Sequence, residues 1–316
     1  MPEKITLIGR AGVGKTSILR VLFEGEYSKD LMINPLEPTR GIIPKIYSWM
    51  DIELSIFDTS GQELPFLLED ENEQMIAFDK VAIVIYIFDY PNWINQSQDI
   101  VNEINMVFKI LKLKNIENNL VLIFHKIDLI KQKASVNYQL MKSGIKERLN
   151  LPKNIPLYLT SISPELDFTS YNAFSEILSS LSQDSNNLKL IVDEKIRFLS
   201  ESICFITNKE NFIIVQSITQ DFNTDLIYKL YILVSYYVKS ISTNSDFENV
   251  IHSIDSTTLT LSLIVSNLEN LNPNLKNLVL ISDTNNKDDL FKVKENIKLE
   301  IEKYYDSADN KNIKKK

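Results

Sequence analysis

The sequence lacks several features that mark secreted, membrane-embedded or nucleic-acid-binding proteins. Its one cysteine, Cys204, lies in an apolar run where we expect a small buried residue, and it cannot form an internal disulfide. No apolar run reaches the ~20 residues of a membrane-spanning helix, and no signal segment or myristoylation pattern is present. The net charge of −8 repels nucleic-acid phosphates. We therefore expect a water-soluble, cytoplasmic protein with no membrane span and no nucleic-acid partner.

What the sequence does contain is enough apolar material for two packed domains. Its 316 residues are 44% hydrophobic, and a chain of this length exceeds one ordinary small domain. Up to about residue 181, short continuous apolar runs alternate with helix-like segments, which is typical of a parallel sheet covered by helices. Those runs are Ile5–Ile8, Leu54–Phe57, Val81–Phe88, Leu120–Phe124 and Leu157–Leu159. With an antiparallel hairpin over 45–57 at the edge, they predict a mostly parallel six-stranded α/β sheet with helices on both faces.

A polar stretch, Ser182–Asn187, predicts a linker between the two domains. We therefore assign residues 1–184 and 185–306 to the domains, and 307–316 to a polar, basic and disordered tail. In the second domain, apolar spacing predicts a helix from Leu188, strands at 203–207 and 212–217, and a long helix over 224–242. Three further strands, one of them over 259–265 with a solvated face, and a last helix complete an α+β domain around an antiparallel sheet.

Glycine is scarce in the chain, and its positions indicate a phosphate-binding loop. Three of the seven glycines follow the strand Ile5–Ile8 in a full match to G-x-x-x-x-G-K-[ST]. The matching residues are Gly9, Arg10, Ala11, Gly12, Val13, Gly14, Lys15 and Thr16. Backbone N–H groups of such a loop, up to Ser17 in the first turn of the next helix, surround nucleotide phosphates. Lys15 is expected to contact the β- and γ-phosphates, and Thr16 to bind Mg²⁺.

A second motif predicts the rest of a magnesium and hydrolysis site. The residues Asp58-Thr59-Ser60-Gly61-Gln62 follow an apolar strand, so Asp58 is expected to make a water-mediated contact with Mg²⁺. The Gly61 amide is expected to bind the γ-phosphate, and Gln62 to orient the attacking water. Upstream, Thr39 lies between a helix and the hairpin, where a threonine would bind Mg²⁺ only while the γ-phosphate is present. Gln62, Lys15 and Thr39 are the expected catalytic residues.

A third motif predicts the base. The strand Leu120–Phe124 ends in His125-Lys126-Ile127-Asp128, which matches the guanine motif N/T-K-x-D except at the histidine. Asp128 is expected to accept hydrogen bonds from two guanine donors that adenine lacks, and an unpaired carboxylate can reject the wrong base by roughly 10⁴ to 10⁵. The Lys126 stem is expected along the base, and His125 to make a structural hydrogen bond. After the strand at 156–159, Ser161 and Ile162 are expected to offer an amide to guanine O6. The expected ligands are GTP or GDP with Mg²⁺.

Together these motifs resemble the Rag/Gtr family of small GTPases, nearer to its A/B-type members. The resemblance depends on His125 in the guanine motif, on VAIVIYIFD at 81–89, and on Thr160-Ser161-Ile162 followed by YNAFSEI at 171–177. The element order of the second domain resembles the roadblock domain of the same family. The resemblance implies a switch that forms a homodimer, or a heterodimer with a related GTPase, through its C-terminal domain. It also implies roadblock-type scaffold proteins, activating and exchange factors as partners, and nutrient signalling of the TORC1 type at an endomembrane reached through those partners.

Two departures from the usual pattern leave other functions open. Ala11 carries a methyl group beside the expected position of Gln62, where many small GTPases have glycine, so slow hydrolysis and an unusual activating partner are expected. The segment LEPTRGI at 36–42 is as similar to Arf proteins as to Rag proteins. The alternatives are a nucleotide-bound scaffold subunit with negligible turnover, or an Arf- or Rab-like trafficking GTPase with an added domain. Arg10 and Arg40 are expected to be surface or loop residues rather than catalytic groups.

Overall fold

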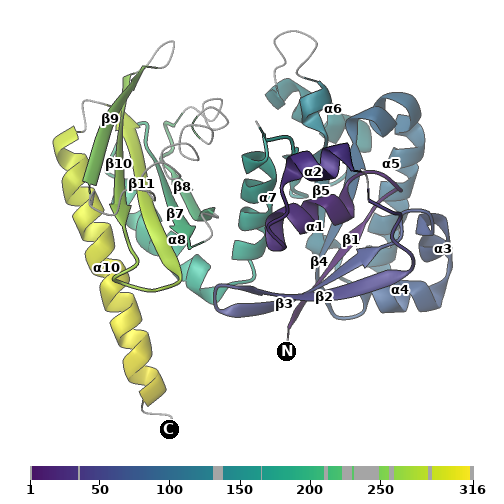
Figure 1. Ribbon diagram of the computed structural model, residues 1–316, viewed down its shortest axis with the longest axis horizontal. Coiled ribbons are helices and arrows are strands. Elements are labelled where there is room, and N and C mark those ends of the chain that lie inside the picture. Colours follow the sequence, from purple (N-terminus) through teal and green to yellow (C-terminus); the bar gives the residue numbers. More distant parts are fainter. Residues whose placement is uncertain are drawn as a thin grey trace. The chain divides into compact units, whose positions relative to one another are not determined.

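A computed structural model describes residues 2–34, 36–130, 138–164, 166–209, 213–222, 230, 249–255, 260–283 and 287–313. The chain divides into two compact units, Met1–Ala173 and Phe174–Lys316, which are described one at a time (Figure 1). In the described ranges, no helix has both the length and the apolar run needed to cross a bilayer.

The first unit is built on a six-stranded sheet in the order β2-β3-β1-β4-β5-β6. Only the edge strand β2 is antiparallel to its neighbour; the other pairings are parallel. This confirms the predicted mostly parallel sheet and its edge hairpin. The strands are β1 (Glu3–Ile8), β2 (Ile42–Trp49), β3 (Ile52–Thr59), β4 (Val81–Asp89), β5 (Leu120–His125) and β6 (Leu157–Leu159).

Helices cover both faces of this sheet, with α1 and α7 side by side on one face and α5 on the other (Figure 1). The central strands are therefore buried on both faces, and every residue of β5 is buried. The helices are α1 (Lys15–Phe23), α2 (Ser28–Ile33), α3 (Leu64–Glu69), α4 (Glu71–Phe78), α5 (Tyr90–Leu113), α6 (Tyr138–Leu149) and α7 (Phe168–Ser179), with short 3₁₀ turns η1 (Glu117–Asn119) and η2 (Ile127–Leu129).

The parallel arrangement brings the predicted motifs to one edge of the sheet. The phosphate loop follows β1, the Asp58 motif ends β3, and the base motif ends β5. Because these three strands run in the same direction, the loops that follow them meet outside their carboxyl ends. A ligand site is therefore expected at that edge, between motifs that are far apart in the sequence.

The second unit contains a five-stranded, fully antiparallel sheet in the order β8-β7-β11-β10-β9. Helices α8 and α10 pack against each other and against this sheet. The elements are α8 (Gln183–Ile196), β7 (Ile203–Asn208), β8 (Ile213–Ile218), β9 (Asn249–Asp255), β10 (Thr260–Asn267), β11 (Leu275–Asp283) and α10 (Lys287–Ile313). The long helix predicted over 224–242 lies outside the described residues except for Leu230, which is buried.

Three local expectations for the second unit differ from the structure. The stretch 182–187 is not a linker, because the Ser182 hydroxyl accepts a hydrogen bond from the Ser185 amide and caps α8, which begins at Gln183. The compact units divide within α7 rather than at residue 184; the end of α7 belongs to the second unit, where the Ser179 hydroxyl donates to the Ile214 carbonyl. The predicted disordered tail is helical as far as Ile313.

Strand β10 also differs from its expected half-solvated pattern. Leu261, Leu263 and Val265 are buried as predicted, but Ser262, Ile264 and Ser266 on the alternate positions are buried as well. Alternation with serine suggested a solvated face, yet the side chains on both faces of β10 are buried. Small hydroxyl side chains can therefore be buried on a face of the sheet, and the polarity of a residue does not by itself show that it is exposed.

Candidate functional site

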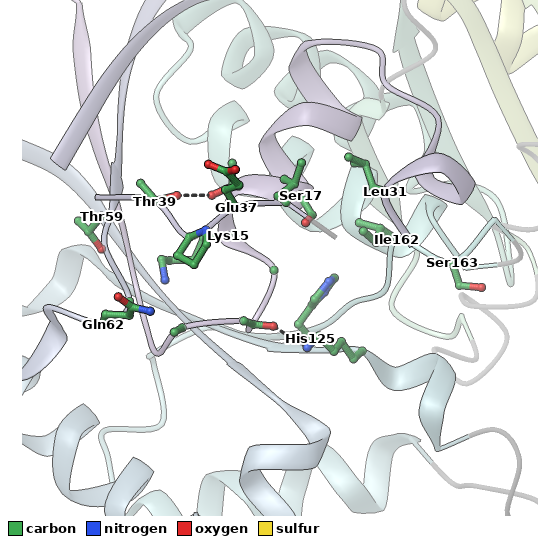
Figure 2. A pocket seen from close by; sticks show the side chains of 18 of the residues that line it. Lys15, Ser17, Leu31, Glu37, Thr39, Thr59, Gln62, His125, Ile162 and Ser163 are labelled. Carbon is green, nitrogen blue, oxygen red and sulfur yellow. Dashed lines mark hydrogen bonds between the residues drawn. The ribbon is translucent and has the colours of Figure 1, made fainter. Parts of the chain in front are cut away.

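A cavity of about 440 Å³ lies at the carboxyl edge of the first unit's sheet. In Figure 2, Thr39 and Gln62 lie at one end of this pocket, and Leu31, Ile162 and Ser163 lie at the other. All three predicted motifs contribute to its wall, together with the segment after α2. The lining residues are Ala11, Gly12, Gly14, Lys15, Thr16, Ser17, Leu31, Leu36, Glu37, Pro38, Thr39, Thr59, Gly61, Gln62, His125, Lys126, Asp128, Leu129, Ile162 and Ser163.

The phosphate loop depends on glycine where it touches the neighbouring strands. Gly9 has φ +143°, and a Cβ atom there would lie 2.1 Å from the Ile87 carbonyl oxygen of β4. Gly14, with φ +103°, packs against His125, whose Cδ2 would be 2.9 Å from an added Cβ. Both positions combine a left-handed backbone with a close approach, so a side chain would displace the loop from the strand ends. Val13, within the loop, is buried and does not line the pocket.

Lys15 is a buried cation held by the loop itself. Its Nζ donates to the carbonyl oxygens of Gly9 at 2.7 Å and Arg10 at 3.1 Å. Within the described part of the chain no carboxylate forms an ion pair with this ammonium, although Asp58 lies near enough to favour its charge. Burial lowers the pKa of Lys15 from 10.5 to about 8. An ammonium held by neutral carbonyls in a pocket is suited to bind an anion such as a phosphate.

Three oxygen-bearing side chains converge next to Lys15. The Thr16 hydroxyl donates to Asp58 Oδ2 at 2.6 Å and lies 2.9 Å from the hydroxyl of Thr39. Asp58 is almost fully buried, and its Oδ1 has no hydrogen-bond partner among the described residues. Burial raises the pKa of Asp58. Hydroxyl and carboxylate oxygens around an unsatisfied buried atom fit Mg²⁺, which prefers oxygen donors and retains water ligands.

The two segments beside this oxygen cluster are bonded to each other. The Ser60 amide donates to the Gly41 carbonyl at 2.7 Å, and the Gly41 amide donates to Glu63 Oε2 at 3.0 Å. Gly61 lies against the phosphate loop, since an added Cβ would be 2.3 Å from the Ala11 nitrogen. Gln62 is exposed and lines the pocket, as Ala11 does. Thr39 and Gln62 thus reach the same end of the pocket.

The base motif is joined to the phosphate loop through Lys126. Its Nζ donates to the Gly12 carbonyl at 2.6 Å and to Asp89 Oδ2 at 2.7 Å. These contacts hold Lys126 in a left-handed conformation, φ 60°, which is uncommon for a residue with a side chain. Asp89, at the end of β4, also caps α5 by accepting from the Asn92 amide at 3.0 Å.

At the other end of the pocket, Asp128 is oriented by Ser161. The Ser161 hydroxyl donates to Asp128 Oδ1 at 2.5 Å, which leaves Oδ2 for a ligand. The Ser161 amide is already used, because it donates to Thr169 Oγ1 at 2.9 Å. Of the two residues expected to offer an amide to the base, Ile162 lines the pocket and Ser161 does not.

His125 is a structural hydrogen-bonding residue that stays neutral. Its Nδ1 lies 2.8 Å from the Thr160 hydroxyl, and the ring is buried against Gly14. Burial, helped by the neighbouring Lys126 cation, lowers the pKa of His125 from 6.5 to about 3. The site therefore contains no imidazolium at neutral pH.

This depressed pKa predicts a loss of stability on acidification. Because the folded pKa lies below the unfolded one, the contribution of His125 is complete above pH 6.5 and is lost as pH falls towards 3. Wild-type protein should lose about 1.4 kcal/mol of unfolding free energy per pH unit more than His125→Asn in that window. Urea unfolding of both proteins at neutral and mildly acidic pH measures this difference. Equal slopes for the two proteins would contradict a neutral, buried His125.

Several contacts of the site were missed by sequence reasoning. Arg10 does not line the pocket; its guanidinium leaves the loop and pairs with Glu103 on α5, in agreement with a role outside catalysis. Leu31 and Glu37 line the pocket from α2 and the segment after it. Their types and spacing carry no signal of ligand binding. Asp89 could have been found, because an aspartate before Pro91-Asn92 at a strand end is typical of a helix N-cap.

This sheet, with a phosphate loop after an interior strand and a base motif after β5, defines a GTP-binding protein of the P-loop class. The sequence matches the family described as the Gtr1/RagA G protein conserved region over residues 4–238, and the chain belongs to this family of GTPases. It is similar to the Ras-related GTP-binding protein A of Dictyostelium discoideum. The two are 22% identical over 229 residues, which cover 72% of this chain and 73% of the relative.

Proposed function

We propose that this protein is a slow GTP-hydrolysing switch, in which the segments of Thr39 and Gly61 are held in place only while the γ-phosphate is bound. The observation that carries the proposal is the convergence of Thr16, Thr39 and Asp58 beside Lys15, at the end of the pocket that Gln62 reaches. GTP hydrolysis removes the γ-phosphate, so contacts that depend on it are lost in the GDP state. A partner that binds one arrangement of these segments would then read the nucleotide.

In this mechanism each group of the chain has a separate task. Lys15 binds the β- and γ-phosphates, Thr16 and Thr39 would hold Mg²⁺, and Asp58 would contribute to the metal site through water. When bound, Mg²⁺ supplies positive charge to the phosphate oxygens where negative charge develops. The Gly61 amide binds the γ-phosphate, and Gln62 orients a water molecule for in-line attack. Arg10 takes no direct part, because its guanidinium is occupied by Glu103, so an arginine would come from an activating partner.

Replacing Gln62 by leucine tests the hydrolytic part of the proposal. Within the part of the chain that the structure describes, the exposed Gln62 side chain makes no hydrogen bond that the substitution would remove. GTP and GDP affinity should therefore stay unchanged, while single-turnover hydrolysis falls at least about tenfold from a rate on the order of 10⁻⁴ s⁻¹. Gln98→Leu, an exposed glutamine on α5, is the matched control and should hydrolyse at the wild-type rate. Measurable hydrolysis that Gln62→Leu does not reduce would contradict the role of Gln62.

The same measurement separates a switch from a scaffold. Ala11 and Gln62 both line the pocket, and the methyl group of Ala11 favours slow turnover or an unusual activating partner. If wild-type protein binds GTP but shows no turnover, even with candidate activating proteins, the nucleotide-bound scaffold explains the chain better. An Arf- or Rab-like trafficking GTPase with an added domain is the remaining alternative, and it would give a chain that stays monomeric and binds no related GTPase.

The second unit suits a role in assembly. The proposal of a roadblock-like domain is supported by its five-stranded antiparallel sheet with α8 and α10, as far as the described residues extend. We propose that it forms a homodimer, or a heterodimer with a related GTPase, and that scaffold, activating and exchange factors recruit the assembly to an endomembrane for nutrient signalling. The mass of the purified chain in solution, alone and with a related GTPase, tests this. A monomer under both conditions would contradict it.

A further inference from the structure

The first charged side chain of the phosphate loop points out of the nucleotide pocket. Arg10 Nε lies 3.0 and 3.1 Å from the two carboxylate oxygens of Glu103, and its Nη2 lies 2.7 Å from Oε1. Its Nη1 also donates to the side chain of Gln96, where α5 is kinked. The side chains of Arg10 and Glu103 are each only 20% exposed. The guanidinium thus makes several charge-assisted hydrogen bonds to one carboxylate, a side-chain fork that is mostly shielded from solvent. Such a pair holds its geometry better than an exposed surface ion pair does.

Glu103 is itself held in place from the sheet. The hydroxyl of Tyr86, which is fully buried on β4, donates to Glu103 Oε2 at 2.6 Å. Burial raises the pKa of Tyr86, so the phenol keeps the proton that it donates. Tyr86 pairs with Ile8, the last residue of β1 before the phosphate loop, and Ile87 beside it contacts Gly9. The carboxylate therefore joins β4 and α5 to the beginning of the loop.

The other end of this arrangement is the phosphate-binding lysine. The backbone carbonyl of Arg10 is one of the two oxygens that hold the Lys15 ammonium, at 3.1 Å. A rotation of residue 10 would change where that carbonyl points, and with it the position of the ammonium. The side-chain fork to Glu103 restrains such a rotation.

We propose that Glu103 is a positioning residue for phosphate binding, which acts through Arg10 on Lys15. This inference rests on the proposed phosphate-binding role of Lys15. It assigns to α5, a helix that contributes no side chain to the pocket lining, a share in the affinity for the β-phosphate.

If Glu103 acts only through its charge, replacing it should strengthen nucleotide binding; if it acts through positioning, replacing it should weaken binding. These opposite changes in affinity make the inference testable. Removing a negative charge near a polyanion site strengthens anion binding by Coulomb's law. Loss of positioning weakens it. Glu103→Gln keeps the size of the side chain and removes the charge, so a weaker affinity for GDP identifies positioning, and a stronger or unchanged affinity rejects it.

The experiment compares GDP with GMP, which lacks the β-phosphate. In the full chain, Glu103→Gln should bind GDP about tenfold more weakly, measured by competition with a fluorescent nucleotide, while GMP affinity stays within about twofold. A general loosening of the pocket would weaken both nucleotides equally and would overturn the proposal. If wild-type protein fails to bind GDP at all, the proposed function fails instead, so the two failures are distinguishable.

Controls come from the same cluster. Asp99→Asn removes the same charge from the same helix, but Asp99 is 65% exposed and lies 3.9 Å from Arg10, so GDP binding should not weaken. Arg10→Gln should reproduce the loss, and the double variant with Glu103→Gln should lose no more than either single one, because one interaction is removed in all three. Additive losses would overturn the proposal. If Glu103→Gln does not fold, Tyr86→Phe provides the second variant. It should weaken GDP binding by less than Glu103→Gln would, and it should leave GMP binding unchanged.

Discussion

Replacing Asp128 by asparagine should convert the pocket from guanine to xanthine nucleotides. Ser161 donates to Oδ1 of Asp128, and in the variant the asparagine carbonyl is the group that can accept this bond. The amide NH₂ then takes the place of Oδ2 and faces the base. Guanine presents an amino group there, so two donors oppose each other, whereas xanthine presents a carbonyl oxygen that accepts.

The expected change is large because hydrogen bonds to a carboxylate are lost and a repulsive contact replaces them. GTP and GDP affinity should fall by roughly 10²- to 10⁴-fold, and xanthosine diphosphate should become the preferred ligand. Competition of the four diphosphates of guanosine, xanthosine, inosine and adenosine measures the preference directly. Ser161→Ala is the matched control: it frees the carboxylate to rotate and should weaken guanine nucleotides without changing their rank. An unchanged preference in Asp128→Asn would refute base recognition by this residue.

The sheet and the motifs could be predicted from the sequence because each depends on local spacing. Continuous apolar runs predict strands buried on both faces, and the motifs directly follow those runs, so parallel order alone brings Lys15, Asp58 and Asp128 to one edge. Thr39 was expected to join Thr16 at the metal because it lies between a helix and the edge hairpin, and the two hydroxyls are 2.9 Å apart.

What could not be predicted depends on contacts between distant elements. Nothing near Arg10 or Glu103 in the sequence indicates that the two residues pair, since they are 93 positions apart. The helix start at Gln183 was missed for a related reason: a run of Ser, Gln, Asp and Asn is typical of loops, and the same residues cap helices when an apolar face follows. The Ser161 amide was expected to bind the base. In the structure it donates to Thr169 instead, and this tertiary contact could not be foreseen from the sequence.

Replacing Lys15 by methionine should remove most of the affinity for nucleotide phosphates. Methionine keeps much of the apolar stem in its buried position and removes the ammonium that Gly9 and Arg10 hold. GDP and GTP affinity should fall by roughly 10²- to 10⁴-fold, because charge-assisted bonds to phosphate oxygens are lost. GMP affinity should fall much less. Lys45→Met removes an equal charge from the partly exposed ion pair that Lys45 on β2 makes with Glu24, and it should change all three affinities little.

The lowered pKa of Lys15 adds a second signature, which is read from the difference between wild-type protein and Lys15→Met. In the free protein this pKa is about 8, so above pH 8 the lysine must take up a proton before it can bind phosphate as a cation. Wild-type affinity for GDP should therefore be constant below pH 8 and fall by about tenfold per pH unit above it. Lys15→Met should show no such decline, whereas Lys45→Met should keep it. A wild-type affinity that is independent of pH between 7 and 9.5 would show that burial does not lower the pKa of Lys15 to about 8. The lysine would then be fully protonated in the free protein, before the nucleotide binds.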